Sequence, residues 1–267
     1  MATGSLQVNR DIILATKKQY LKQQMKTIPL DAVLALAQMQ SRARDFMNYS
    51  NDHRELVVIA QVSRHEVYDP VTSALQCLLS GADAISFFTD HSIYHQDLDD
   101  LLLVTRAMAD VPVIYQNYPM HEYDAVSARA AGASSMVTYS SLIDASQVRK
   151  IVSMAQRWNM TTIVQVNSEE ELQSALALSP HVVAVGDNLS ADISATLESL
   201  HAIRTTLPWY IKVCLMPTIH TLADFELATK APVDAVIVSE ALFKNERTAK
   251  KLQQMMKDIR AKRQSTL

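Results

Sequence analysis

The sequence predicts a (β/α)8 barrel, an α/β TIM-barrel fold, with an N-terminal helical extension. Eight short apolar runs, rich in β-branched residues, alternate with segments that have apolar residues at helical spacing. The order of helix, small-residue turn and apolar strand recurs, most clearly around Gly81-Ala82-Asp83 and Gly132-Ala133-Ser134. An open nucleotide-binding sheet would usually have a glycine-rich first turn, whereas residues 63–69 contain no glycine. The alternation therefore favours a closed parallel barrel.

Two helical segments precede the first strand. Residues 8–26 and 30–48 both place apolar side chains at helical spacing among polar ones. We assign residues 1–50 to a helical extension packed on the barrel and residues 51–267 to the barrel, with one domain in all. A single barrel domain of this length is common.

The first strand and its loop are expected to matter most for function. Val57 to Val62 is a near-continuous apolar run, which is typical of a strand buried on both faces. A helix should begin after Asp69-Pro70, a capping residue followed by proline at the first helical position. The loop between them would lie on the functional face of a barrel.

The remaining elements follow the same pattern. Further strands are predicted near residues 84–88, 111–116, 135–139, 161–166, 181–186, 210–215 and 234–238. Helices are predicted near residues 70–80, 97–109, 121–131, 144–158, 168–178, 190–206, 219–230 and 244–262. Predicted helix caps are Asp97, Asp144, Ser190 and Ser168, the last with Glu171 as a capping box.

Composition excludes several classes of function. The formal net charge is −3 and the pI is about 6.2, so we expect no nucleic-acid binding. No signal-peptide core is present and no apolar run approaches about 18 residues, so we expect a cytoplasmic protein with no membrane association. The two cysteines, Cys77 and Cys214, match no zinc spacing and suit a reducing compartment. We expect no cofactor and no metal.

Six motifs occur in a fixed order along the chain. They are Arg44-Asp45-Phe46, Val58-Ile59-Ala60-Gln61-Val62-Ser63-Arg64, Gly81-Ala82-Asp83-Ala84-Ile85-Ser86 followed by Thr89-Asp90, Pro112-Val113-Ile114, Ala128-Arg129-Ala130-Ala131-Gly132-Ala133, and Val164-Gln165-Val166 followed by Glu169-Glu170-Glu171-Leu172. In order and spacing, the chain resembles the indole-3-glycerol phosphate synthase family from about residue 10 to residue 245. The resemblance implies a lyase of tryptophan biosynthesis on the predicted fold.

The functional positions implied by the resemblance carry other residues here. The family's first-strand glutamate and lysine fall at Gln61 and Ser63, and its Ser-Pro-Ser-x-Gly loop is absent. The general-acid lysine of the third strand falls at Gln116, and the fifth-strand glutamate falls at Gln165. The remaining positions, a substrate-contacting asparagine, a seventh-strand glutamate and a phosphate-binding glycine, fall at Gly186, Met216 and Ser239.

These replacements predict a barrel that has lost the family reaction. Indole ring closure needs a proton donor, a proton acceptor and support for a carboxylate and a phosphate. Glutamine side chains only hydrogen-bond and do not exchange protons near neutral pH. We therefore expect a non-catalytic binding or regulatory protein. The alternative is an indole-3-glycerol phosphate synthase, or a related carboxy-lyase, with altered catalytic residues.

Other chemistry could occupy the mouth of the barrel. Polar residues expected at the strand ends are His65, Glu66, Asp90, His91, Asp187, Cys214 and Glu240. A metal at Asp90, His91 and His95, or a Cys214 nucleophile, would be new chemistry, but solvent-exposed loop histidines and an apolar barrel-lining cysteine are the simpler interpretations. Glu240 is expected to cap the last helical region, and Asp187 to serve a turn.

A ligand in the mouth is the expected partner, and nine residues are candidates to contact it. They are Gln61, Ser63, His65, Asp90, Gln116, Gln165, Asp187, Thr218 and Ser239. Twelve methionines, several of them on the terminal helices, leave open a protein partner or a homo-oligomer.

Overall fold

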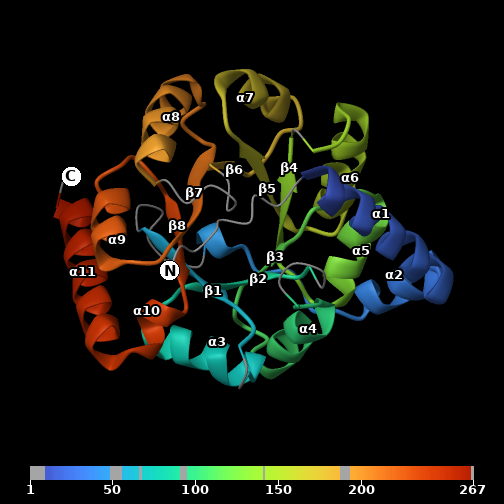
Figure 1. Ribbon diagram of the computed structural model, residues 1–267, viewed down its shortest axis with the longest axis horizontal. Coiled ribbons are helices and arrows are strands. Elements are labelled where there is room, and N and C mark those ends of the chain that lie inside the picture. Colours follow the sequence, from blue (N-terminus) through green and yellow to red (C-terminus); the bar gives the residue numbers. More distant parts are fainter. Residues whose placement is uncertain are drawn as a thin grey trace, which may run out of the picture.

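The computed structural model describes residues 10–48, 56–65, 68–90, 95–140, 142–186 and 193–265. Eight parallel strands form a closed barrel in the order β1 to β8, surrounded by helices (Figure 1). The strands are β1 (Val57–Val62), β2 (Ala84–Phe88), β3 (Val113–Gln116), β4 (Ser135–Tyr139), β5 (Thr161–Val166), β6 (Val182–Val185), β7 (Lys212–Ile219) and β8 (Ala235–Ser239).

The helices alternate with these strands along the chain. They are α1 (Arg10–Thr27), α2 (Leu30–Gln38), the 3-10 helix η1 (Phe46–Asn48), α3 (Pro70–Leu79), α4 (Leu98–Ala107), α5 (Glu122–Ala130), α6 (Ala145–Arg157), α7 (Glu169–Leu176), α8 (Ile193–Thr206), α9 (Leu222–Thr229), α10 (Ala241–Lys244) and α11 (Glu246–Ser265). Within the described ranges, no helix is both long and apolar enough to cross a membrane.

The barrel closes where β8 pairs with β1, with Val57 opposite Ala235 and Gln61 opposite Ser239. The predicted fold is confirmed. Strands of a closed parallel barrel are covered on one face by helices and on the other by the interior, which explains their unbroken apolar runs.

Three elements differ from the sequence-based prediction. The helix predicted over residues 30–48 ends at Gln38, and η1 follows it. A short helix that was not predicted, α10, precedes the last helix, and the extended backbone of Asn245 separates it from α11, which begins at Glu246. Strand β7 continues to Ile219 through Pro217, because its register against β8 shifts between Leu215 and Ile219. An irregular register of this kind tolerates a proline within a strand.

The predicted helix starts are confirmed at four positions, the first of them at Asp69, whose side chain accepts a hydrogen bond from the backbone of Thr72 ahead of Pro70. The side chains of Asp97, Asp144 and Ser168 each accept a hydrogen bond from the first turn of their helix. The capping box predicted at Ser168 is wrong in one half, because the carboxylate of Glu171 accepts from the backbone of Asn167 at 2.7 Å. Ser190 lies outside the described residues.

Two apolar layers stabilise the barrel. An outer cluster fills the space between strands and helices, and an inner cluster fills the barrel itself. Phe46 of η1, which has no exposed surface, belongs to the inner cluster together with Val57 and Ile59. Next to it, Asp45 accepts a hydrogen bond from the Thr161 hydroxyl at the start of β5. The segment after α2 therefore closes the N-terminal end of the barrel.

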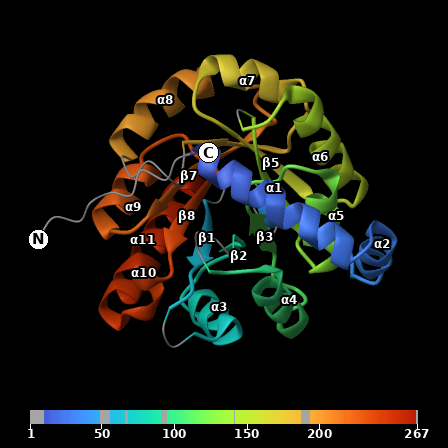
Figure 2. The same cartoon turned by 45° about the vertical axis from the view of Figure 1, so that its right-hand side comes forward.

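The extension also packs along the side of the barrel (Figure 2). Leu21 of α1 and Val33 of α2 are buried against Tyr123 and Val126 of α5. The buried guanidinium of Arg129 donates to the carbonyls of Ala133, at 3.0 Å, and of Ser41. Burial lowers the pKa of Arg129. The domain limit at residue 50 falls between the described ranges and stays a prediction.

Candidate functional site

The three glutamines at family positions lie in one layer of the barrel interior. Gln61, Gln116 and Gln165 each follow, by two residues, an isoleucine of the inner cluster. Side chains two residues apart in a strand share a face, so the glutamines point into the barrel. Met216 completes the layer from β7. Alternate strands supply such layers in barrels of this kind.

Hydrogen bonds fix the orientation of two of these glutamines. The Thr218 hydroxyl donates to Oε1 of Gln61 at 2.6 Å. Nε2 of Gln165 donates to Oδ1 of Asn167 at 2.9 Å and to the carbonyl of Gly186 at 2.7 Å. Its Oε1 is buried and accepts no hydrogen bond from the residues that the structure describes. Buried acceptors are normally satisfied, so this oxygen is an exception among the described groups.

An aromatic wall stands beside this layer on β2 to β4. The ring of Tyr118 lies 5.3 Å from that of Phe88 and 5.1 Å from that of Tyr139, measured between centroids. All three side chains belong to the inner cluster. Rings at these distances pack favourably against each other and against a further aromatic group. The aromatic wall, whose three side chains are 1–3% exposed, and the hydrogen-bonding floor of glutamines therefore fill the barrel interior just below its mouth.

Gly186, which stands where the family has an asparagine, packs closely against Pro217 of β7. Gly186 has a φ of +94°, which disfavours other residues. A Cβ atom there would lie 2.5 Å from Cγ2 of Thr196 and 2.8 Å from Cδ of Pro217. With Pro217 in this position, an asparagine at residue 186 would not fit without a shift of the backbone.

A buried carboxylate joins β8 to the loop after β1. Glu240 is 2% exposed and accepts a hydrogen bond from the backbone of Ser63 at 3.2 Å. It also pairs with Nε2 of His65 and, at 2.9 Å, with Nζ of Lys244. As expected, Glu240 is the N-cap residue of α10, but its side chain makes no capping hydrogen bond there. His65 is held by Glu240 yet has a side chain that is 52% exposed, so a ligand can reach it.

Arg64, the neighbour of His65, is turned away from the barrel axis. Its guanidinium lies 3.6 Å from the Asp100 carboxylate and 5.3 Å from the centroid of the Tyr68 ring. Burial raises the pKa of Asp100, and the positive charge of Arg64 opposes that change. Arg64 therefore neutralises a carboxylate of α4 and adds no charge to the mouth.

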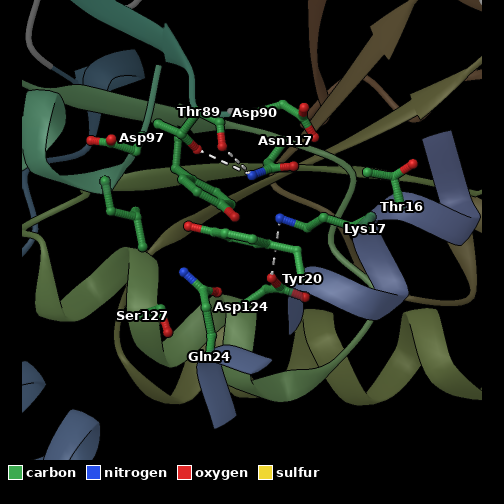
Figure 3. A pocket seen from close by; sticks show the side chains of 12 residues that line it. Thr16, Lys17, Tyr20, Gln24, Thr89, Asp90, Asp97, Asn117, Asp124 and Ser127 are labelled. Atoms are coloured by element: carbon green, nitrogen blue, oxygen red, sulfur yellow. Dashed lines mark hydrogen bonds and ion pairs between the residues drawn. The ribbon is translucent and has the colours of Figure 1, made fainter. Parts of the chain in front are cut away.

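A separate cavity, the rim cavity, lies between α1 and the barrel (Figure 3). Its volume is about 170 Å³. Its described lining residues are Thr16, Lys17, Tyr20, Gln24, Thr89, Asp90, Asp97, Leu98, Tyr115, Asn117, Asp124 and Ser127. The sequence pattern predicted Asp90 from its place after β2, but nothing in that pattern indicated that Lys17 and Asp124 join it. Lys17 is one of several lysines on a polar helix, and only the packing of α1 on α5 buries it.

The other predicted residues divide between these places. Thr218 joins the floor of the mouth through Gln61, and Ser63 contacts Glu240 through its backbone. The Ser239 hydroxyl accepts from the backbone of Ala241 at 3.4 Å. Glu66, His91 and Asp187 lie outside the described residues. Within the described ranges, no group of three or more His, Cys, Asp or Glu side chains could hold a metal ion.

Cys214 lies inside the barrel rather than at its mouth. Because β7 extends to Ile219, Cys214 falls two residues below Met216 and is 1% exposed. Burial raises the pKa of its thiol to about 12, and the nearby Asp234 carboxylate adds to this rise. Burial likewise raises the pKa of the Cys77 thiol to about 12. Protonated, buried thiols are poor nucleophiles, so the interpretation of Cys214 as a small core residue fits this placement.

Neither thiol should react in the folded protein. We expect no release of thionitrobenzoate when the native chain meets Ellman's reagent at pH 8, and reaction of both cysteines in guanidinium chloride, because unfolding exposes them. Rapid reaction of one thiol in the native protein would contradict the burial of these two side chains.

Comparisons with known proteins agree over most of the chain. The family model described as "Indole-3-glycerol phosphate synthase" matches residues 10–255. The indole-3-glycerol phosphate synthase of Dichelobacter nodosus is 26% identical over 250 residues, covering 88% of this chain and 92% of that protein. The one from Roseiflexus sp. is 26% identical over 246 residues, covering 86% and 91%.

Solved structures share the fold at low identity. The 3-hexulose-6-phosphate synthase of Salmonella typhimurium superposes with a TM-score of 0.65 at 12% identity, covering 76% of this chain and all of that one. KGPDC from Streptococcus mutans gives 0.62 at 11% identity, covering 78% and 98%. These likenesses concern the barrel alone. The match of the family model over residues 10–255 shows that the chain belongs to the indole-3-glycerol phosphate synthase family.

Proposed function

We propose that the chain is a carboxy-lyase of the indole-3-glycerol phosphate synthase type, acting in tryptophan biosynthesis with altered catalytic residues. The observation that carries this proposal is the aromatic wall of Phe88, Tyr118 and Tyr139 beside a hydrogen-bonding floor, in a member of that family. The family's substrate is an aryl ring that bears a carboxylate and an amino sugar phosphate. An aromatic wall complements the ring, and amides complement its polar groups.

The glutamines of the floor would orient the substrate. Ring closure forms a carbon–carbon bond to the substrate carbonyl, whose oxygen takes up a proton, and carbon dioxide leaves from the aryl carbon. The resulting hydroxyl then leaves as water with a second proton, and a proton is lost from the substrate. Since Gln61, Gln116 and Gln165 cannot supply these protons, we assign proton transfer to His65, with Glu240 as its positioning residue.

Charge at this edge of the mouth supports the same assignment. The buried carboxylate of Glu240 holds His65 on one side and Lys244 on the other. A carboxylate bound to one ring nitrogen fixes the orientation of an imidazole. The half-exposed imidazole could then donate a proton to an oxygen of a ligand in the mouth.

A second candidate is a barrel that binds a ligand without converting it. This is the function that the sequence predicted from the glutamines at the family's catalytic positions. The observation that favours it is the layer of glutamines in the barrel interior, where Gln61, Gln116 and Gln165 offer only amide groups toward the barrel axis. Such a protein would be a receptor or a regulator. The loss of lyase activity therefore stays a prediction, and one assay separates it from the first candidate.

The experiment uses the full purified chain with 1-(2-carboxyphenylamino)-1-deoxyribulose 5-phosphate. Formation of indoleglycerol phosphate at roughly 1 s⁻¹ or faster would support the lyase. Binding of the same compound by calorimetry, with no product after long incubation, would support the second candidate and reject the first. Absence of both binding and turnover would reject both. Growth of a strain that lacks the synthase, when given this gene, is an independent check.

A further inference from the structure

We propose that the rim cavity between α1 and the barrel binds a small zwitterionic amino acid. The cavity lies to the side of the barrel axis. Tyr115, which lines it, belongs to the outer apolar cluster, and Asp124 and Ser127 reach it from α5. It is therefore distinct from the mouth, where the glutamines and the aromatic wall point inward, and the proposal does not depend on lyase activity.

Lys17 supplies the first observation that points to a ligand. Its side chain is 6% exposed and reaches from α1 into the cavity (Figure 3). Its nearest carboxylate oxygen, Oδ1 of Asp124, lies at 3.7 Å, and the centroid of the Tyr20 ring lies at 5.9 Å. The ammonium donates no hydrogen bond to the described residues. Because a buried ammonium has three donors to satisfy, an acceptor from a ligand, such as a carboxylate, would be stabilised there.

Asp124 alone does not satisfy the hydrogen-bond donors of the Lys17 ammonium. Its Oδ2 already accepts hydrogen bonds from the backbone of Met120 at 2.9 Å and of His121 at 3.1 Å. These bonds fix the carboxylate at the start of α5 and hold it too far from Lys17 for a direct hydrogen bond. An acceptor atom of a ligand placed beside Lys17 would therefore lie closer to the ammonium than the Asp124 carboxylate does.

The surrounding carboxylates decide the charge of the ligand. Asp90, which is 4% exposed, and Asp97 line the cavity together with Asp124. The Asp97 carboxylate accepts from the backbone of Asp99 at 3.0 Å and points away from Lys17 (Figure 3), so a purely anionic ligand would lie close to the charges of Asp90 and Asp124, and a purely cationic one close to Lys17. A zwitterion avoids both conflicts, since its carboxylate faces Lys17 and its ammonium faces the carboxylates. The Asn117 side chain also lines the cavity, and its Nδ2 donates a hydrogen bond to the carbonyl of Thr89 at 2.5 Å, which fixes the amide in place.

The size and the apolar lining narrow the class further. A volume of about 170 Å³ corresponds to roughly six water molecules at about 30 Å³ each. That suits an amino acid with a short side chain, such as alanine, serine or valine. The rings of Tyr20 and Tyr115 line the same space and offer apolar faces to such a side chain.

The test compares alanine with two analogues that each lack one charge, ethylamine and propionate. Binding to the full chain is followed by calorimetry, and serine and valine are tested in parallel. We expect one of the three amino acids to bind and each single-charge analogue to bind at least about tenfold more weakly, because each loses a charge-assisted contact. Ethylamine or propionate binding as tightly as the amino acids would overturn the proposal, as would the absence of binding by all three amino acids.

Variants locate the binding in this cavity. Replacing Lys17 and Asp124 together, as Lys17→Gln with Asp124→Asn, removes the ion pair without leaving one buried charge alone. We expect this double variant to weaken amino-acid binding at least about tenfold. The matched control is Lys18→Gln, an exposed neighbour on α1, which should bind as the wild type does. Unchanged binding in the double variant would overturn the proposal.

Discussion

The His65→Gln variant is expected to lose about 10²- to 10⁴-fold in kcat for indole ring closure, with a nearly unchanged KM. General acid–base catalysis typically contributes a factor of this size. Glutamine keeps a hydrogen-bonding side chain but cannot exchange protons near neutral pH. A loss confined to kcat indicates an interaction that is made in the transition state and not in the ground state. The measurement is steady-state kinetics with the carboxyphenylamino sugar phosphate.

Two further variants make this result specific. His201→Gln, at an exposed position on α8, is the matched control and should keep wild-type kinetics. Glu240→Gln removes the charge that holds His65 while preserving shape, and we expect it to lower kcat by less than His65→Gln does. If the wild type is active and His65→Gln matches it in kcat, proton transfer belongs to another group and the assignment to His65 is wrong.

Phe46→Ala should lower the free energy of unfolding of the chain by about 3–5 kcal/mol. Phe46 has no exposed surface and packs in the inner cluster at the N-terminal end of the barrel. Truncation to alanine would leave a cavity where the strands begin, and closed strands cannot move inward to fill it. Urea denaturation followed by circular dichroism measures the change.

Two control variants test whether the loss of stability comes from the packing of the Phe46 side chain or from any substitution in the extension. Met39→Ala, at a residue that is 80% exposed just after α2, should change stability by no more than about 0.5 kcal/mol. Phe46→Leu keeps most of the volume and should cost less than about 1.5 kcal/mol. Wild-type stability of Phe46→Ala would mean that the extension does not close the barrel.

The strands were predictable because their signal is local. Each strand is buried on both faces, so its apolar run can be recognised in the sequence without knowledge of the neighbouring strands. Strands β2, β4 and β5 begin and end where predicted. The end of β7 could not be predicted from the sequence, because Pro217 is accommodated within the strand only by a shift in register against β8. Helix α2 was overestimated because the apolar Phe46 fits a helical pattern but packs inside the barrel.

For the site, the fold, the family and the three glutamines that face the barrel axis all follow from the sequence alone, since strand order and alternation place them there. Which ionisable groups meet depends instead on the tertiary packing. Glu240 reaches His65 across the junction of β8 and β1, and Lys17 comes from the extension to Asp124 on α5. Burial and charge pairing arise here from contacts between residues more than a hundred positions apart, and because no local pattern encodes such contacts, only the folded chain brings these groups together.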